Sequence, residues 1–136
     1  LHNVTFLPAQ PRESLPMCLA WCDICLVSLR DERIFDIIIP SKTYEYLACG
    51  KPIIMAVDGD ARQLIEGEEC GVWSQPGDNH MLAERILDLM HDTSRRQRYS
   101  LMARSIAEEK YSLTSLTVTY AEVITEAAVT FQHGDL

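Results

Sequence analysis

The stretch P-S-K-T-Y-E-Y-L-A-C-G-K-P-I-I, residues 40–54, decides the fold of this chain. It contains the start of a helix, the end of that helix and the beginning of a buried strand. Pro40 stands where a missing N–H costs nothing, and Ser41 can accept hydrogen bonds from the free N–H groups of a first turn. Gly50 can take the left-handed conformation that ends helices, and the proline two residues later forbids continuation. The stretch therefore predicts a helix over residues 41–49 that leads directly into a strand.

Strands and helices alternate along the rest of the chain. Short apolar runs predict strands at residues 4–7, 24–29, 53–57 and 71–74, and helices are expected at residues 11–21, 41–49 and 60–65, the last capped by Asp60. Residues 30–39 are expected to form a loop. This alternation is typical of an α/β fold, in which a Rossmann-like parallel sheet carries helices on both faces.

The second half of the chain is predicted to be helical. Three amphipathic helices with short joints are expected to pack back on the sheet. Their apolar faces are Leu82, Ile86, Leu89 and Met90; then Tyr99, Met102, Ala103 and Ile106; and, after a Ser112 cap, Leu116, Tyr120, Val123, Ile124 and Ala127.

Polar side chains cluster at the start of the helix at residues 41–49. Lys42 and Glu45 lie in its first turn, where free N–H groups and the helix dipole favour phosphate binding at the carboxyl end of a parallel strand. Ser41 and Glu45 are four positions apart rather than three, so they do not form a reciprocal capping box. We therefore expect a ligand site here. The structural alternatives are a cap for Ser41, a solvated cation for Lys42 and a dipole partner for Glu45.

These residues also carry a family resemblance. E-Y-L-A-C-G-K-P-I-I, from Glu45 onward, resembles the E-A-M-A-C-G-x-P-V-I segment of the retaining GT-B glycosyltransferases, the glycosyl transferase group one family. Three further segments resemble motifs of that family in the same order: N-V-T-F-L-P at residues 3–8, W-C-D-I-C-L-V-S-L at residues 21–29 and G-V-W-S-Q-P-G-D at residues 71–78. The resemblance implies that Glu45 holds the ribose hydroxyls of a nucleotide sugar and that the preceding loop wraps its diphosphate and sugar.

The sequence departs from the family pattern before Glu45. The family carries a second glutamate eight positions earlier, where this chain has Ile37, and Asp36 lies one residue further back. The run D-I-I-I-P-S-K, residues 36–42, resembles a P-S-K variant of enzymes that build bacterial surface polysaccharides. This implies that Asp36 replaces the missing glutamate and that Lys42 contacts the phosphates. A loop carboxylate in water remains the alternative for Asp36.

The chain of 136 residues is long enough for one domain, whereas the resemblance implies two Rossmann-like domains with a cleft between them. The chain starts at Leu1, without an initiator Met or a signal peptide. We therefore expect residues 1–131 to be the carboxyl-terminal, nucleotide-sugar-binding domain without its first two βα units, a truncated half of the GT-B fold, and residues 132–136 to be a polar tail. In the family, those units carry an Arg and a Lys that neutralise the donor diphosphate.

This truncation predicts the partners. We expect a nucleotide-sugar donor, the missing amino-terminal domain and, through the parent enzyme, a sugar or lipid-linked acceptor, while the fragment alone is expected to be inactive. Residues 4–7 would lose the neighbouring strands of the family's sheet. They are expected to pair with residues 24–29 or to exchange with a second copy, which would give a homodimer.

Composition excludes several partner classes. Hydrophobic residues make up 47% of the chain, yet no apolar run approaches the ~20 residues that cross a bilayer. The net charge of −8 argues against nucleic acid and anionic lipid as partners. Five cysteines in apolar contexts suit the reduced thiols of a cytoplasmic protein. Any contact of the parent with the inner membrane, as a peripheral enzyme, would come from its missing part.

No metal site and no cofactor is expected, with the nucleotide sugar bound as a substrate. Cys18, Cys22 and Cys25 lack a fourth ligand at metal-binding spacing, and Cys25 lies in a buried strand rather than at a redox helix N-terminus. The four histidines, His2, His80, His91 and His133, are scattered. Two alternatives remain open: a noncatalytic nucleotide-binding or receiver-like signalling module, and a sugar-nucleotide epimerase domain. The P-A-Q-P that follows residue 7 does not provide the acidic pocket of a receiver.

Overall fold

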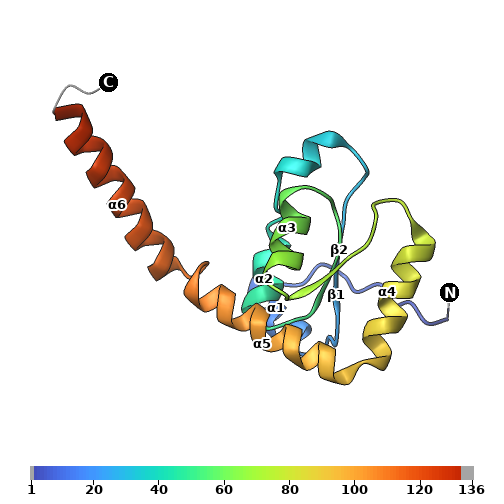
Figure 1. The fold of residues 1–136 in the computed structure, drawn as a ribbon. Helices are drawn as coiled ribbons and strands as arrows, with labels where there is room; N and C mark the ends of the chain where they lie inside the picture. The colour runs from blue at the N-terminus through green and yellow to red at the C-terminus, as the bar shows by residue number, and fades with distance from the viewer. Residues whose placement is uncertain (1, 133–136) are drawn as a thin grey trace.

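A computed structural model describes residues 2–132 of the chain, which form a three-stranded parallel sheet surrounded by helices (Figure 1). The strands are β1 (Cys25–Ser28), β2 (Ile53–Ala56) and β3 (Gly71–Trp73), in the spatial order β1-β2-β3. Val27 of β1 lies opposite Met55 of β2, which in turn lies opposite Trp73 of β3. Three of the four predicted strands are thereby confirmed.

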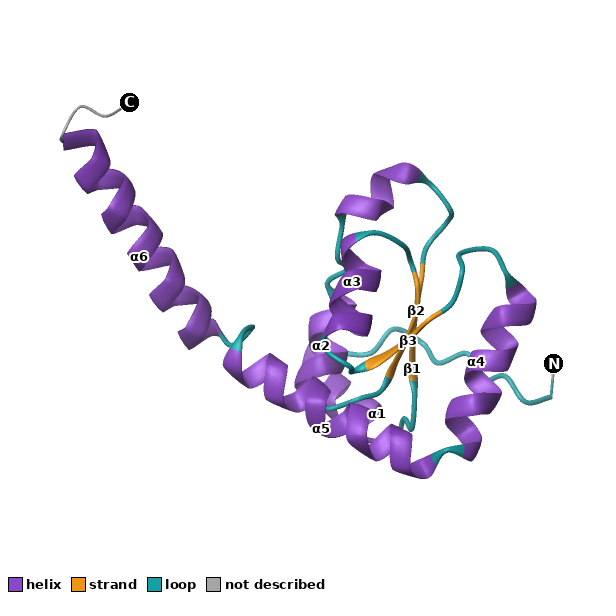
Figure 2. Cartoon of the chain, viewed as in Figure 1, coloured by secondary structure: helices purple, strands orange, loops and turns teal. Residues whose placement is uncertain are grey.

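The helices form two layers (Figure 2). In chain order, the helical elements are η1 (Arg12–Ser14), α1 (Leu15–Ala20), η2 (Arg33–Ile37), α2 (Lys42–Ala48), α3 (Asp60–Gly67), α4 (Asn79–His91), α5 (Thr93–Glu109) and α6 (Leu113–Gln132), where η denotes a 3-10 helix. Helices α2 and α3 lie on one side of the sheet and α4 lies on the other, while α5 contributes residues to the core on both sides. The predicted α/β class with helices on both faces is confirmed.

Apolar residues on both faces of the sheet make the core. Ile53 and Met55 of β2 face the α2, α3 and α5 layer, while Ile54 faces α4, as the alternation of a pleated strand requires. All four residues of β2 are buried, because helices cover this central strand on both sides. Burial of each Ile or Met side chain of this strand contributes about 1.5–3 kcal/mol. This packing holds the strand ends, where the candidate site lies, on a rigid base.

Helix α2 ends as its sequence predicts. Gly50 has φ +60°, its N–H donates to the Leu47 carbonyl, and the Lys51 N–H donates to the Tyr46 carbonyl. This is the Schellman arrangement, in which glycine provides the left-handed residue after the helix. The Gly50 carbonyl in turn accepts a hydrogen bond from Ser100 Oγ of α5. The turn that begins β2 is therefore joined directly to α5.

Residues 4–7 do not form the predicted strand, and their predicted pairing with β1 is wrong. Val4, Phe6 and Leu7 are 44%, 92% and 69% exposed, and β1 is paired with β2 alone in the described part of the chain. An extended segment is stable only where a neighbour satisfies its N–H and C=O groups. The apolar run at 4–7 has no such neighbour within residues 2–132.

Helix α6 does not pack back on the sheet as predicted. It extends away from the body of the domain, and its apolar side chains Leu116, Tyr120 and Val123 are 48–69% exposed (Figure 1). The sheet keeps exposed apolar surface at its edge, where Leu26 of β1 is 41% exposed, but α6 projects away from it. The predicted start of the helix is confirmed, since the Ser115 N–H donates to Ser112 Oγ.

Smaller differences concern helix ends and edges. The predicted loop at 30–39 contains the 3-10 helix η2, and Asp60 is the first residue of α3 rather than its cap, which is Gly59. Met90 and Met102 remain 56% and 38% exposed, because they lie at the margins of the buried faces of α4 and α5. The predicted tail at 132–136 and His133 fall almost entirely outside the described residues.

Candidate functional site

The residues of the predicted site lie at the carboxyl edge of the sheet. Because the three strands are parallel, the chain leaves β1 at this edge, passes through η2 and enters the first turn of α2 there (Figure 1). Asp36 belongs to η2, Ser41 precedes α2, Lys42 begins it, and Glu45 lies in its first turn. The fold thus brings all four predicted residues to the edge at which open parallel sheets bind ligands.

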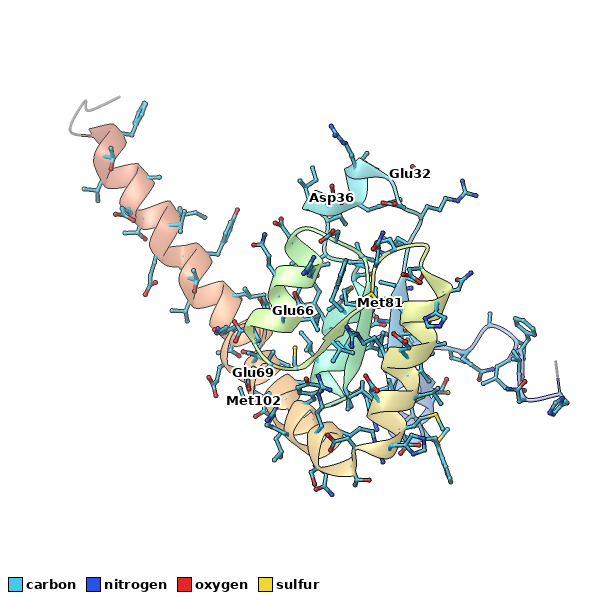
Figure 3. All side chains as sticks on the ribbon, turned by 45° about the vertical axis from the view of Figure 1, so that its right-hand side comes forward. Glu32, Asp36, Glu66, Glu69, Met81 and Met102 are labelled. Atoms are coloured by element: carbon cyan, nitrogen blue, oxygen red, sulfur yellow. The ribbon has the colours of Figure 1, made fainter. Side chains whose placement is uncertain are left out.

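The four side chains are available to a ligand. Asp36, Ser41 and Glu45 are exposed and Lys42 is half-buried. Within the described residues, none of these side chains makes a hydrogen bond or an ion pair with the protein. Figure 3 shows Asp36, with Glu32 nearby, on the segment beyond the strand ends. Two carboxylates and one ammonium group therefore lie at this edge without a protein partner that would occupy them.

The start of α2 differs from the prediction in one respect. Ser41 has helical dihedral angles, φ −55° and ψ −34°, and its hydroxyl makes no capping hydrogen bond. A capping side chain needs an extended backbone to reach the free N–H groups, so the predicted role of Ser41 as a cap is wrong. The N–H groups of Thr43 and Tyr44 donate to the carbonyls of Pro40 and Ser41. The first turn therefore offers fewer free N–H groups than the sequence suggested. Phosphate binding at this turn would depend more on the charge of Lys42.

Sequence reasoning missed the residues that hold this edge together. Phe35 and Ile39 flank Asp36 in the chain and pack against the main core. Thr43, next to Lys42, is fully buried, and its hydroxyl has no hydrogen-bond partner. The sequence could not single them out, because the neighbouring apolar residues Ile37 and Ile38 are exposed. The burial of Thr43 depends on how α2 packs against the core, so it could not be predicted from the sequence.

The cysteines serve mainly as apolar packing. All five are free thiols, Cys25 and Cys70 are buried, and Cys18, Cys22 and Cys49 are half-buried. Burial raises the pKa of Cys25 and of Cys70 to about 12, which keeps both as neutral thiols near neutral pH. The side chains of residues 2–132 include no group of three or more His, Cys, Asp or Glu placed to hold a metal ion.

The remaining predicted features are peripheral. His80 lies on an exposed turn of α4, with its Nδ1 3.4 Å from Glu84 Oε1, and His91 is exposed at the end of the same helix. No helix in the described range 2–132 combines the length and apolar character required to cross a bilayer.

Comparisons with known proteins agree with this geometry. The family model described as "Glycosyl transferases group 1" matches residues 1–105. The probable glycosyltransferase WbjE of Pseudomonas aeruginosa is 34% identical over 71 residues, which make up 52% of this chain and 18% of WbjE. The chain thus aligns with less than a fifth of the length of that relative.

Solved structures show the same fold. The crystal structure of Anabaena Alr3699/HepE in complex with UDP matches 85% of this chain with a TM-score of 0.66 at 24% sequence identity, and the match covers 30% of HepE. The complexes of HepE with UDP-glucose and with UDP and glucose give TM-scores of 0.68 and 0.69. Together with the match of the family model over most of the 136 residues, these findings identify the chain as a member of the group 1 glycosyl transferases.

Proposed function

We propose that this chain is the donor-binding domain of an enzyme that transfers a sugar from a nucleotide sugar with retention of the anomeric configuration. The observation that carries the proposal is the group of partnerless polar side chains at the carboxyl edge of the sheet, in a chain of this family. The motif around Glu45 and the P-S-K sequence before it support a role in the assembly of bacterial surface polysaccharide. Both alternative functions, a binding module and an epimerase domain, fit the family match less well.

Each site residue has a role that its chemistry suits. The Glu45 carboxylate can accept hydrogen bonds from both ribose hydroxyls of the nucleotide. The Lys42 ammonium is a compact positive charge for the diphosphate, and the Ser41 hydroxyl can donate to a phosphate oxygen. Asp36, on η2, can accept from a hydroxyl of the sugar. We propose that these side chains hold the donor without a metal or a cofactor.

Catalysis would come chiefly from placing the donor and stabilising its leaving group. When the bond between the sugar and the diphosphate breaks, negative charge develops on the departing phosphate oxygen. A cation held beside that oxygen lowers the barrier, because the charge that it stabilises is larger in the transition state than in the substrate. Lys42 is the cation among the four proposed site residues. Attack by the acceptor requires a surface opposite the sheet edge, which a second domain would supply.

The exposed apolar residues support a second domain as partner. Ile34 and Ile37 of η2 are 61% and 76% exposed next to the candidate site, and Val123 of α6 is 56% exposed. Apolar groups in such numbers favour burial against another domain over contact with water. We therefore propose that the isolated chain binds nucleotides weakly and transfers no sugar.

The test compares the complete enzyme with the isolated chain. Each is incubated with UDP-glucose and other nucleotide sugars and with candidate acceptors, and both the released nucleoside diphosphate and the glycosylated product are measured. Transfer by the complete enzyme alone, with the anomeric configuration retained in the NMR spectrum of the product, is expected. Epimerisation of the nucleotide sugar, or binding without turnover by the complete enzyme, would refute the transferase assignment. An inverted product would refute retention.

A further inference from the structure

Gly59, in the turn between β2 and α3, lies directly against the main chain of Asp36. A β-carbon added at Gly59 would stand 2.5 Å from the carbonyl carbon of Asp36 and 2.6 Å from its Cα, and closer still to its carbonyl oxygen. Real β-carbons essentially never approach a heavy atom outside their own residue and its chain neighbours within 3.0 Å. Because the opposing atoms belong to the backbone, no side chain can rotate to make room. Only glycine allows η2 to lie this close to the start of α3.

The backbone of Gly59 is itself specific to glycine. Its dihedral angles are φ +67° and ψ −134°, a region that residues with a β-carbon rarely enter. Its N–H donates to Asp58 Oδ1 at 3.0 Å, and its carbonyl accepts from the Gln63 N–H at 3.0 Å. Val57 and Ala61 on either side are buried in the core. The surface that Gly59 presents to Asp36 is therefore fixed by the sheet and by α3.

The segment that carries Asp36 has few other anchors. None of the residues of η2 is buried, and Phe35 alone among them packs against the main core. The carboxylate of Asp36 makes no hydrogen bond or ion pair in the described part of the chain. The position of Asp36 is thus set by the packing of Phe35 on one side and by the contact with Gly59 on the other.

We propose that Gly59 is a positioning residue for the donor site: it provides the flat surface on which η2 rests, so that Asp36 is held at the edge where Lys42 and Glu45 lie. This inference rests on the proposed function, in which Asp36 contacts the sugar of the donor. Gly59 acts through the main chain of Asp36 and need not touch the donor itself.

The test is Gly59→Ala in the complete enzyme, with Gly67→Ala as the matched control. Gly67 ends the same helix, is exposed, and has no atom within 4 Å of an added β-carbon. Because displacement of a binding group by about 1 Å can reduce reaction efficiency up to 100-fold, we expect Gly59→Ala to lower kcat/KM for the donor by about 10- to 100-fold. Gly67→Ala should stay within about twofold.

Two further measurements distinguish a positioning role of Gly59 from a general loss of stability. In a double-mutant cycle with Asp36→Asn, the effect of Gly59→Ala should shrink to less than about threefold, because the carboxylate that it misplaces is already gone. Amide hydrogen exchange should quicken at residues 33–38 in Gly59→Ala and remain unchanged in Gly67→Ala. Multiplicative effects in the cycle, or unchanged exchange at residues 33–38, would overturn the proposal.

A folding failure of Gly59→Ala is also informative. The same substitution is then made in a variant in which Gly-Gly replaces residues 34–37, which removes the opposing main chain of Asp36. Because the replacement also removes Phe35, this background is first shown to fold with Gly59 intact. Recovery of folding in that background supports the contact, whereas continued failure assigns the effect to backbone strain alone and overturns the proposal. If the wild-type enzyme transfers no sugar from any nucleotide sugar, the proposed function fails, while hydrogen exchange still decides whether Gly59 holds η2.

Discussion

Replacement of Glu45 by Gln in the complete enzyme should separate donor binding from folding. Glu45 is exposed in α2, and its carboxylate has no hydrogen-bond or ion-pair partner among residues 2–132. Gln keeps the size and the helix propensity of the side chain but removes the charge. Any loss must therefore come from a ligand or from the interaction of the charge with the helix dipole.

The two contributions differ enough in size to be distinguished. A carboxylate shared by two ribose hydroxyls makes charge-assisted hydrogen bonds, which contribute roughly 1.5–3 kcal/mol. At about 1.4 kcal/mol for each factor of ten, donor affinity and kcat/KM should fall by about one to two orders of magnitude. The helix-dipole interaction of this first-turn carboxylate is about 0.3–1 kcal/mol, so the free energy of unfolding should fall by no more than about 1 kcal/mol.

The assay combines initial rates of sugar transfer, calorimetric titration with the nucleoside diphosphate and thermal unfolding. Glu13→Gln is the matched control, since Glu13 is an exposed acidic residue in the first turn of η1 without a side-chain partner in the described structure. It should change neither transfer nor unfolding. Normal transfer by Glu45→Gln together with a lower unfolding temperature would show that Glu45 is a structural residue and would refute its assignment to the ribose.

Further predictions concern the diphosphate, the thiols and the contact between α2 and α5. Lys42→Ala should weaken binding of the nucleoside diphosphate more than that of the monophosphate in calorimetric titrations, and an equal loss for both would place Lys42 away from the diphosphate. Burial raises the pKa of Cys25 and Cys70 from 9.0 to about 12, so between these values the folded state binds more protons than the unfolded state. Stability to urea should therefore be lost as the pH rises through this range, with a smaller loss in Cys→Ala variants at these two positions, and the same pH profile in the variants would contradict the assignment. Ser100→Ala removes the hydrogen bond to the Gly50 carbonyl and should lower the free energy of unfolding by about 0.5–1.5 kcal/mol, whereas Ser94→Ala, at an exposed serine of the same helix, should change it by less than about 0.5 kcal/mol.

Local chemistry explains what could be predicted for the candidate site. Asp36, Lys42 and Glu45 were assigned to one edge because the carboxyl ends of parallel strands always meet there, and the structure places them at that edge. The predicted capping role of Ser41 was wrong. The type of a residue indicates which hydrogen bonds its side chain can accept, but it does not determine the dihedral angles of the backbone. The contact of Asp36 with Gly59 was not foreseen, since it joins residues far apart in the chain.

The amino-acid sequence by itself determined the elements whose cause is local or repeated along the chain. The apolar runs of β1, β2 and β3, the left-handed Gly50 after α2 and the Ser112 cap of α6 all appear as predicted. Hydrophobic pattern and turn chemistry act over a few residues, so they can be read directly.

Only the tertiary structure decided which apolar segments are covered. Residues 4–7 and α6 carry apolar side chains, yet these are exposed, because burial also requires a partner surface within reach and α6 extends away from the sheet. The same reason applies to Gly59, whose glycine-specific backbone matters because the main chain of Asp36 lies against it. The pattern of residues predicts which surfaces are stabilised by burial. The packing of segments that are distant in the chain determines which of those surfaces are in fact buried.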